Sequence, residues 1–147
     1  MHSLSHKKLN LEILPSNKFS DIDVVCITEH WLNEHELEYC NIPHYKLISK
    51  FCRKEMIHGG SCIFVKSTLQ AKPFTKFENI YVEEIFEASM IELTFPKLIK
   101  ICIYRTPKSN TIVFTDKLDH ILRELTHQKK KIIIVGDLNI NFFSRKY

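Results

Sequence analysis

The stretch KKKIIIVGDLNIN, residues 129–141, constrains the fold more than any other part of this chain. Its apolar centre runs from Ile132 to Val135 and consists of β-branched residues, which favour strands. An unbroken apolar run of this kind is typical of a strand that is covered on both faces. The run ends directly on GDLN, residues 136–139, and residues of these types suit either a tight turn or an active site.

A second stretch, DIDVVCIT at residues 21–28, repeats this pattern and leads into Glu29 within TEHWL. Each of these two strands, both predicted to be buried, therefore places a carboxylate, Glu29 or Asp137, just past its C-terminal end. In open α/β sheets that edge is where binding and catalytic sites are built. Two hard oxygen ligands at such an edge suit Mg²⁺, which binds through one or two carboxylates and substrate phosphate oxygens.

The rest of the chain supplies the elements of a layered fold. Apolar residues at helical spacing predict helices over 4–14 and, most clearly, over 112–127, while 33–40 favours a short helix. Four more strands are predicted, over 46–52, 59–66, 86–95 and 98–104. Neighbouring strands without room for a crossover helix pair antiparallel. This order of elements indicates an α/β architecture with two sheets face to face and helices outside.

Composition excludes several classes of protein. The 147 residues are 44% hydrophobic and 26% charged, which predicts a globular domain that spans no membrane. The N-terminus, MHSLSHKK, lacks the apolar segment of a secretory signal. Five cysteines without a CxxC pair argue against a disulfide scaffold, so we expect an intracellular protein, nuclear or cytoplasmic. The net charge of +4 is compatible with a polyanionic partner without requiring one.

The residues on their own leave the choice between turn and site open. Gly-Asp after a strand is ordinary turn chemistry, and Asn139 tolerates left-handed backbone. Zinc is a weaker alternative, because the histidines and cysteines between residues 30 and 62 lack the tight pairs of structural zinc sites.

The ordered blocks TEHWL, GGSCIFV, IYRTP and GDLNIN resemble the endonuclease/exonuclease/phosphatase family, which includes apurinic endonucleases and DNase I-like enzymes. The similarity is greatest to the endonuclease domain of non-LTR (LINE-like) retrotransposons, and it extends over about residues 3–141. It implies a DNase I-like αββα sandwich of two sheets and Mg²⁺-dependent hydrolysis of DNA phosphodiester bonds, with Mn²⁺ as an alternative metal. It further implies contact with the DNA phosphate backbone, no small-molecule cofactor, and a reverse transcriptase domain in the parent element.

Matched block by block, the resemblance assigns four site residues. Glu29 resembles the family's metal-binding glutamate, and Tyr104 resembles the tyrosine that contacts the scissile phosphate. Asp137 and Asn139 resemble the GDxN pair. In that pair the aspartate orients or activates the attacking water, and the asparagine helps to hold the water and the phosphoryl group. Arg53 is a further candidate, for orienting a loop beside the site.

Two parts of the family's pattern are not matched in residues 1–147. The family places an asparagine on a strand before the segment that resembles residues 2–14, and a Ser-Asp-His-like segment after GDxN. We therefore expect a single domain, 1–147, truncated at both ends. The alternatives to a DNA endonuclease are a catalytically inactive remnant with at most nucleic-acid binding, and a phosphoesterase of the same fold acting on small phosphoesters. The TEHWL and IYRTP blocks favour the nuclease over the small-molecule phosphoesterase.

Overall fold

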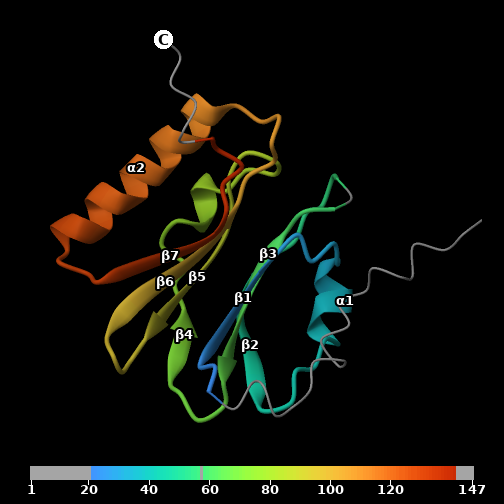
Figure 1. Cartoon of the computed structure of the whole chain (residues 1–147), viewed down its shortest axis with the longest axis vertical. Helices are drawn as coiled ribbons and strands as arrows, with labels where there is room; N and C mark the ends of the chain where they lie inside the picture. Colours follow the sequence, from blue (N-terminus) through green and yellow to red (C-terminus); the bar gives the residue numbers. More distant parts are fainter. Residues whose placement is uncertain (1–20, 57, 142–147) are drawn as a thin grey trace, which may run out of the picture.

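A computed structural model describes residues 21–56 and 58–141, and it consists of four layers (Figure 1). Two sheets pack face to face, and a helix covers the outer face of each, so the expected αββα sandwich is confirmed. The helix predicted over 4–14 lies outside the described residues. None of the helices in the described part of the chain has the length and apolar character needed to span a membrane.

The first sheet is antiparallel and has the strand order β1-β3-β2. Its strands are β1 (Val24–Thr28), β2 (Tyr45–Phe51) and β3 (Ser61–Lys66). The short helix α1 (Glu34–Glu38) covers its outer face and begins at a capping box. In this box Asn33 Oδ1 accepts the Glu36 N–H at 2.8 Å, and the Glu36 carboxylate accepts the Asn33 N–H at 3.1 Å. The predicted short helix and antiparallel strand pair are thus confirmed.

The second sheet has the strand order β4-β5-β6-β7. Its strands are β4 (Ala71–Pro73), β5 (Glu87–Leu93), β6 (Leu98–Tyr104) and β7 (Ile132–Asp137). The pair β5-β6 is antiparallel, whereas β7 runs parallel to β6 because helix α2 (Thr111–His127) carries the chain back between them. Strand β4 and the 3-10 helix η4 (Glu78–Ile80) were not predicted, because three residues are too few to show a period.

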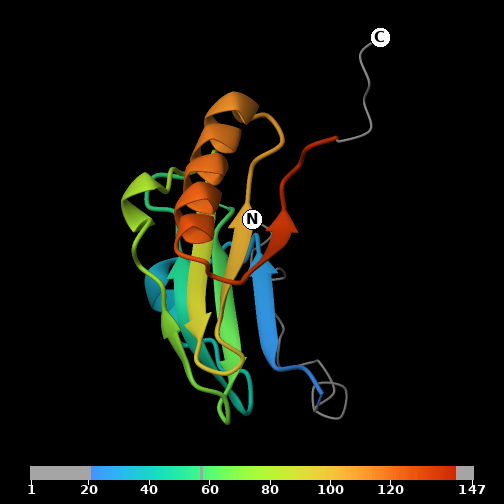
Figure 2. The same cartoon turned by 90° about the vertical axis from the view of Figure 1, so that its left-hand side faces the viewer.

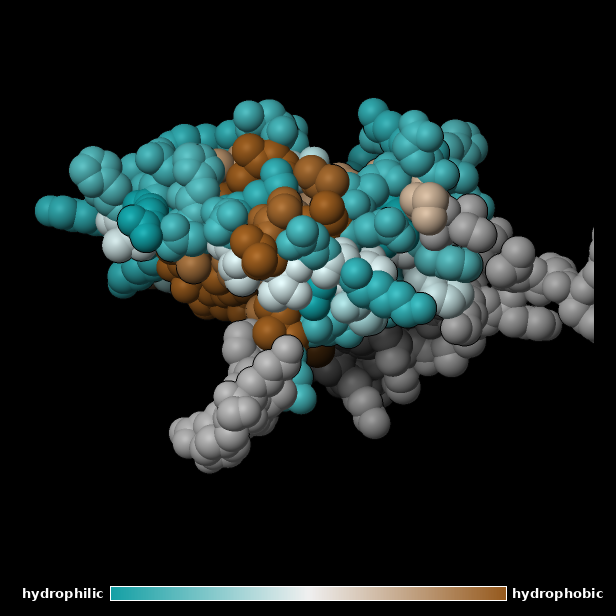
Figure 3. Space-filling model, turned by 90° about the horizontal axis from the view of Figure 1, so that it is seen from above, coloured by the Kyte–Doolittle hydropathy of each residue, from teal (hydrophilic) through white to brown (hydrophobic). Residues whose placement is uncertain are grey.

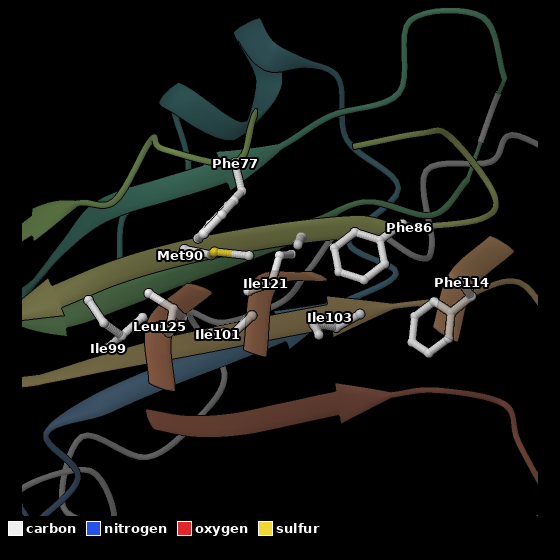
Figure 4. Packing of buried hydrophobic residues seen from close by; sticks show 10 residues of the cluster. Phe77, Phe86, Met90, Ile99, Ile101, Ile103, Phe114, Ile121 and Leu125 are labelled. Atoms are coloured by element: carbon white, nitrogen blue, oxygen red, sulfur yellow. The ribbon is translucent and has the colours of Figure 1, made fainter. Parts of the chain in front are cut away.

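Helix α2 packs on the outer face of the second sheet through its predicted apolar side (Figure 4). Its fully buried residues are Phe114, Ile121 and Leu125. They contact a cluster built from alternate residues of β6 and from β5 and its approach: Ile99, Ile101, Ile103, Phe86, Ala88 and Met90. The intervening residue Cys102 points to the other side, into the core between the sheets. Strand β6 is therefore buried on both faces and forms the centre of the domain.

Strands β1 and β7 are less buried than predicted. Within the described residues β1 pairs only with β3 and β7 only with β6, so each is the edge of its sheet. The two strands lie side by side and run in the same direction (Figure 2). Ile133 and Ile134 are 42% and 36% exposed, respectively. The prediction of full burial was wrong because a β-branched run favours strand formation, whereas burial depends on which elements pack beside it.

Candidate active site

The carboxyl ends of β1, β6 and β7 meet at the upper end of the molecule in Figure 1. Glu29 follows β1, Tyr104 ends β6 and Asp137 ends β7. The Tyr104 hydroxyl donates a hydrogen bond to Glu29 Oε1 at 2.7 Å and so joins the two sheets. Tyr104 and Asp137 are direct partners in the parallel pairing of β6 with β7. Residues more than 100 positions apart in sequence therefore meet around one tyrosine.

Asn139 belongs to the same cluster through two hydrogen bonds, one to a side chain and one to a backbone carbonyl. Its N–H donates to Asp137 Oδ1 at 3.0 Å, and its Nδ2 donates to the Arg105 carbonyl at 2.7 Å. Its φ of 49° lies in the left-handed region, which asparagine tolerates better than most residues. The bond from the Asn139 N–H to the Asp137 carboxylate closes an Asx turn over residues 137–139, called the GDLN turn below, and it holds one oxygen of that carboxylate in place.

Gly136 allows β7 to approach β6 just before Asp137. Its φ is 134°, and a Cβ at this position would lie 1.9 Å from the backbone oxygen of Ile103. No side chain fits there without moving the backbone of one of the two strands. This close approach explains why the apolar run ends on a glycine.

The backbone that carries Glu29 is strained. Glu29 and Trp31 have φ values of 55° and 59°, which are unusual for residues with a Cβ. Two hydrogen bonds hold them: the Glu29 N–H donates to the Gly60 carbonyl at 2.8 Å, and the Trp31 N–H to the Gly59 carbonyl at 3.1 Å. Such conformations cost about 1–3 kcal/mol each and persist only where the surrounding structure fixes them.

Between these two strained residues, His30 is buried at 1% exposure. Its Nε2 donates to the Phe51 carbonyl at 3.0 Å, and its Nδ1 accepts the Leu32 N–H at 3.1 Å. These partners require one neutral tautomer, because a carbonyl can only accept and an amide N–H can only donate. Burial lowers the pKa of His30, against the smaller opposing effect of its backbone hydrogen bonds.

We expect the stability of the domain to depend on the protonation of His30. Its pKa is lower in the folded chain than in the unfolded chain, so its contribution is complete above about pH 6.5 and is lost as the pH falls below that value. The free energy of unfolding should fall by up to about 1.4 kcal/mol per pH unit there. Urea unfolding between pH 8 and pH 5 measures this loss.

The matched controls are His30→Gln, which should weaken the pH dependence, and His35→Gln at an exposed position of α1, which should keep it. Equal slopes for the wild type and His30→Gln would contradict the assignment.

The Tyr104 side chain is almost fully buried, at 4% exposure. Burial, followed by the hydrogen bond to Glu29 and the charge of that carboxylate, raises the pKa of Tyr104 to about 12. The hydroxyl therefore keeps its proton at neutral pH and acts as a hydrogen-bond donor rather than as a base.

Comparison with known families shows to which family the chain belongs. A family model described as the endonuclease/exonuclease/phosphatase family matches residues 6–147. The chain belongs to the endonuclease/exonuclease/phosphatase family. A search of curated proteins found no match. The matched range includes every strand of both sheets, and membership of this family is consistent with a nuclease or phosphoesterase activity.

Arg105, which sequence reasoning missed, organises the turn in this family member. It is 3% exposed, and its guanidinium donates to the carbonyls of Leu138 and Asn139 at 2.8 Å each. It also donates to the Ser109 carbonyl at 2.8 Å and stacks over the Phe114 ring. Arg105 thus fixes the GDLN turn against the start of α2. It lies inside the IYRTP block, so its position next to Tyr104 was the available signal.

We expect Arg105→Lys to lower the free energy of unfolding by about 2 kcal/mol. A lysine keeps the charge, but its compact ammonium lacks the planar fork that reaches several carbonyls at once. Chemical denaturation measures the loss. Arg123→Lys is the control, because Arg123 is 80% exposed and makes an ion pair with Asp119 on the surface of α2. A change below about 0.5 kcal/mol in Arg105→Lys would contradict this role.

Two carboxylates, those of Glu29 and Asp137, supply oxygen donors at this end of the sheets. Among residues 21–56 and 58–141, no group of three His, Cys, Asp or Glu residues is placed to hold a metal ion. Closed zinc sites need such a group, whereas Mg²⁺ typically uses one or two carboxylates and retains several waters. Glu29 and Asp137 each engage one carboxylate oxygen with Tyr104 and Asn139, respectively, and each carboxylate has a second oxygen.

Proposed function

We propose that this domain is a Mg²⁺-dependent endonuclease that hydrolyses DNA phosphodiester bonds and derives from a non-LTR retrotransposon. The observation that carries the proposal is the meeting of Glu29, Tyr104 and Asp137 at one end of two sheets, in a member of a family of nucleases and phosphatases. The DNA substrate is supported by the ordered TEHWL, GGSCIFV, IYRTP and GDLNIN blocks and is consistent with the net charge of +4.

Each of the four residues has a role in this reaction. Glu29 holds the cation, and Asp137 accepts a hydrogen bond from the attacking water and orients it towards phosphorus. Tyr104 keeps its proton at neutral pH and, when substrate binds, turns its single O–H from Glu29 to a phosphoryl oxygen on which negative charge develops. Asn139, fixed by its bond to the Arg105 carbonyl, helps to hold the water and the phosphoryl group. A Mg²⁺ ion held by Glu29 would polarise a phosphoryl oxygen and would lower the pKa of a water bound to it.

The proposed origin adds a partner. An endonuclease domain of this type acts together with a reverse transcriptase of the parent element, so we expect a reverse transcriptase reading frame next to this one. Sequencing the adjoining DNA tests this part of the proposal separately from the enzymatic part.

The enzymatic test is nicking of supercoiled plasmid by the purified chain in Mg²⁺, in Mn²⁺ and in EDTA. The proposal expects nicking with either metal and none in EDTA. A parallel arm offers small phosphoesters, p-nitrophenyl phosphate and inositol phosphates. Turnover of these without nicking would favour the small-molecule phosphoesterase. No turnover of either substrate with either metal would favour the inactive remnant.

A further inference from the structure

A buried ion pair lies beneath the candidate site, and none of the roles above uses it. Arg53 Nε donates to Glu87 Oε1 at 2.6 Å, and the two side chains are 7% and 0% exposed. Removing two charges from water is costly, and an apolar pair of similar volume is often at least as stable. A buried pair of this kind therefore indicates a role other than stability, such as holding neighbouring segments in place.

Glu87 connects three segments of the chain. It begins β5 directly opposite Tyr104 in the pairing of β5 with β6. Besides Arg53, its carboxylate accepts the Gly60 N–H at 2.6 Å and the Glu84 N–H at 2.7 Å. Both carboxylate oxygens are thus engaged by donors of the protein, which suits a role in positioning rather than in metal binding.

The contact with Gly60 leads directly to Glu29. The Gly60 carbonyl accepts the Glu29 N–H at 2.8 Å, so Glu87 holds one side of this peptide segment and Glu29 the other. Gly60 has a φ of 90°, and a Cβ there would lie 2.4 Å from His30 Nε2. The segment is therefore pressed against the buried His30. These contacts supply the external support that the left-handed backbone of Glu29 requires.

Arg53 extends the same network to the second sheet. Its Nη2 donates to Thr106 Oγ1 at 3.1 Å, and the Thr106 N–H donates to the Glu84 carbonyl at 2.9 Å. Thr106 directly follows Arg105, which binds the carbonyls of the GDLN turn. One buried pair therefore contacts the segment behind Glu29 and the segment that follows Tyr104.

We propose that Arg53 and Glu87 are positioning residues, which set the distance between Glu29 and the Tyr104–Asp137 end of the second sheet so that a divalent cation can bind there. Sequence reasoning named Arg53 as a candidate for orienting a loop and missed Glu87. The cation-binding part rests on the proposed function, whereas the placement of residues 29–31 does not.

The test compares Glu87→Gln, Arg53→Met and the double variant Arg53→Met/Glu87→Gln. Each single change leaves one buried charge without its partner, and we expect the melting temperature to fall by about 10 °C. The double variant contains neither charge, so the part of the loss that comes from an unpaired charge should return, while the amide nitrogen introduced by Glu87→Gln still faces one of the two backbone N–H donors. Glu124→Gln is the control, because Glu124 pairs with Lys76 on the surface of α2 at 45% exposure.

Three readouts separate positioning from stability in the double variant. Trp31 is the sole tryptophan in the sequence, and its backbone N–H donates to the Gly59 carbonyl. The centre of its ring lies 4.3 Å from that of His58, so its fluorescence emission reports the placement of residues 29–31. We expect the wavelength of maximum Trp31 emission to differ between the double variant and the wild type. Mn²⁺ binding without DNA, measured by electron paramagnetic resonance, should weaken about tenfold. The kcat for plasmid nicking should fall about 10- to 100-fold, with the KM within about threefold of the wild type.

A double variant that regains stability together with wild-type Trp31 emission and wild-type Mn²⁺ affinity would overturn the proposal, because the pair would then contribute stability alone. If the wild type neither binds Mn²⁺ nor nicks DNA, the proposed function fails. The Trp31 emission still decides the placement of residues 29–31 in that case: a shift in the double variant supports it, and an unchanged spectrum overturns it.

Discussion

Replacing Gly136 by alanine is expected to destabilise the domain by about 3 kcal/mol or more, the largest stability loss we predict for a single methyl group. The added Cβ would stand 1.9 Å from the Ile103 backbone oxygen, and this oxygen cannot move aside as the end of a side chain can. Strand β7 would have to separate from β6 at the pair of Ile103 with Gly136, directly before Asp137. Chemical denaturation with far-ultraviolet circular dichroism measures the loss.

The control for this variant lies on the same strand. Ile133→Ala truncates a side chain that is 42% exposed and leaves the backbone unchanged, so we expect a cost of about 1 kcal/mol. If Gly136→Ala were as stable as Ile133→Ala, this result would contradict the close approach of β7 to β6 at Gly136.

The second large effect concerns catalysis. Under the proposed roles, Glu29→Gln removes the charge that would bind the cation and Asp137→Asn the carboxylate that would orient the water, so we expect each to lower the rate of plasmid nicking about 10³-fold. Both side chains are exposed, so the free energy of unfolding should change by less than about 1 kcal/mol. Initial rates at saturating Mg²⁺, with unfolding curves for each variant, measure the two quantities separately.

Matched controls use carboxylates away from the site. Glu34→Gln changes an exposed residue of α1 that pairs with Lys50, and Asp119→Asn changes an exposed residue of α2. Both should nick at the wild-type rate. A rate loss in these controls equal to that in Glu29→Gln would show that net charge, rather than position, governs the reaction.

Much of the fold could be predicted because apolar residues recur at regular spacing along its long helix and strands. The apolar side of α2 and the strands β2, β3, β5 and β6 follow from local patterns that the final packing did not override. The exposure of β1 and β7 could not be predicted, because an apolar run does not show which strands or helices pack beside it. The short elements β4 and η4 carry too few residues for a pattern.

The residues of the candidate site that stand at strand ends could be predicted from the sequence. The residues that hold these strand ends in place by hydrogen bonds could not. Glu29 and Asp137 were found because carboxylates at strand ends are a known position for chemistry. Glu87 and Arg105 act through contacts with residues 27 to 34 positions away, which no local pattern reveals. One signal for Glu87 was present: it is the single charged residue in the stretch FEASMI, and a charge is costly to bury unless it has a fixed partner.

The measurement that tests the central claim most directly is the initial rate of plasmid nicking by wild type and Glu29→Gln, side by side, in Mg²⁺ and in EDTA. The account predicts that the wild type nicks only with Mg²⁺ and that Glu29→Gln nicks about 10³-fold more slowly. Nicking by the wild type that persists in EDTA, or equal rates for the two proteins in Mg²⁺, would contradict it.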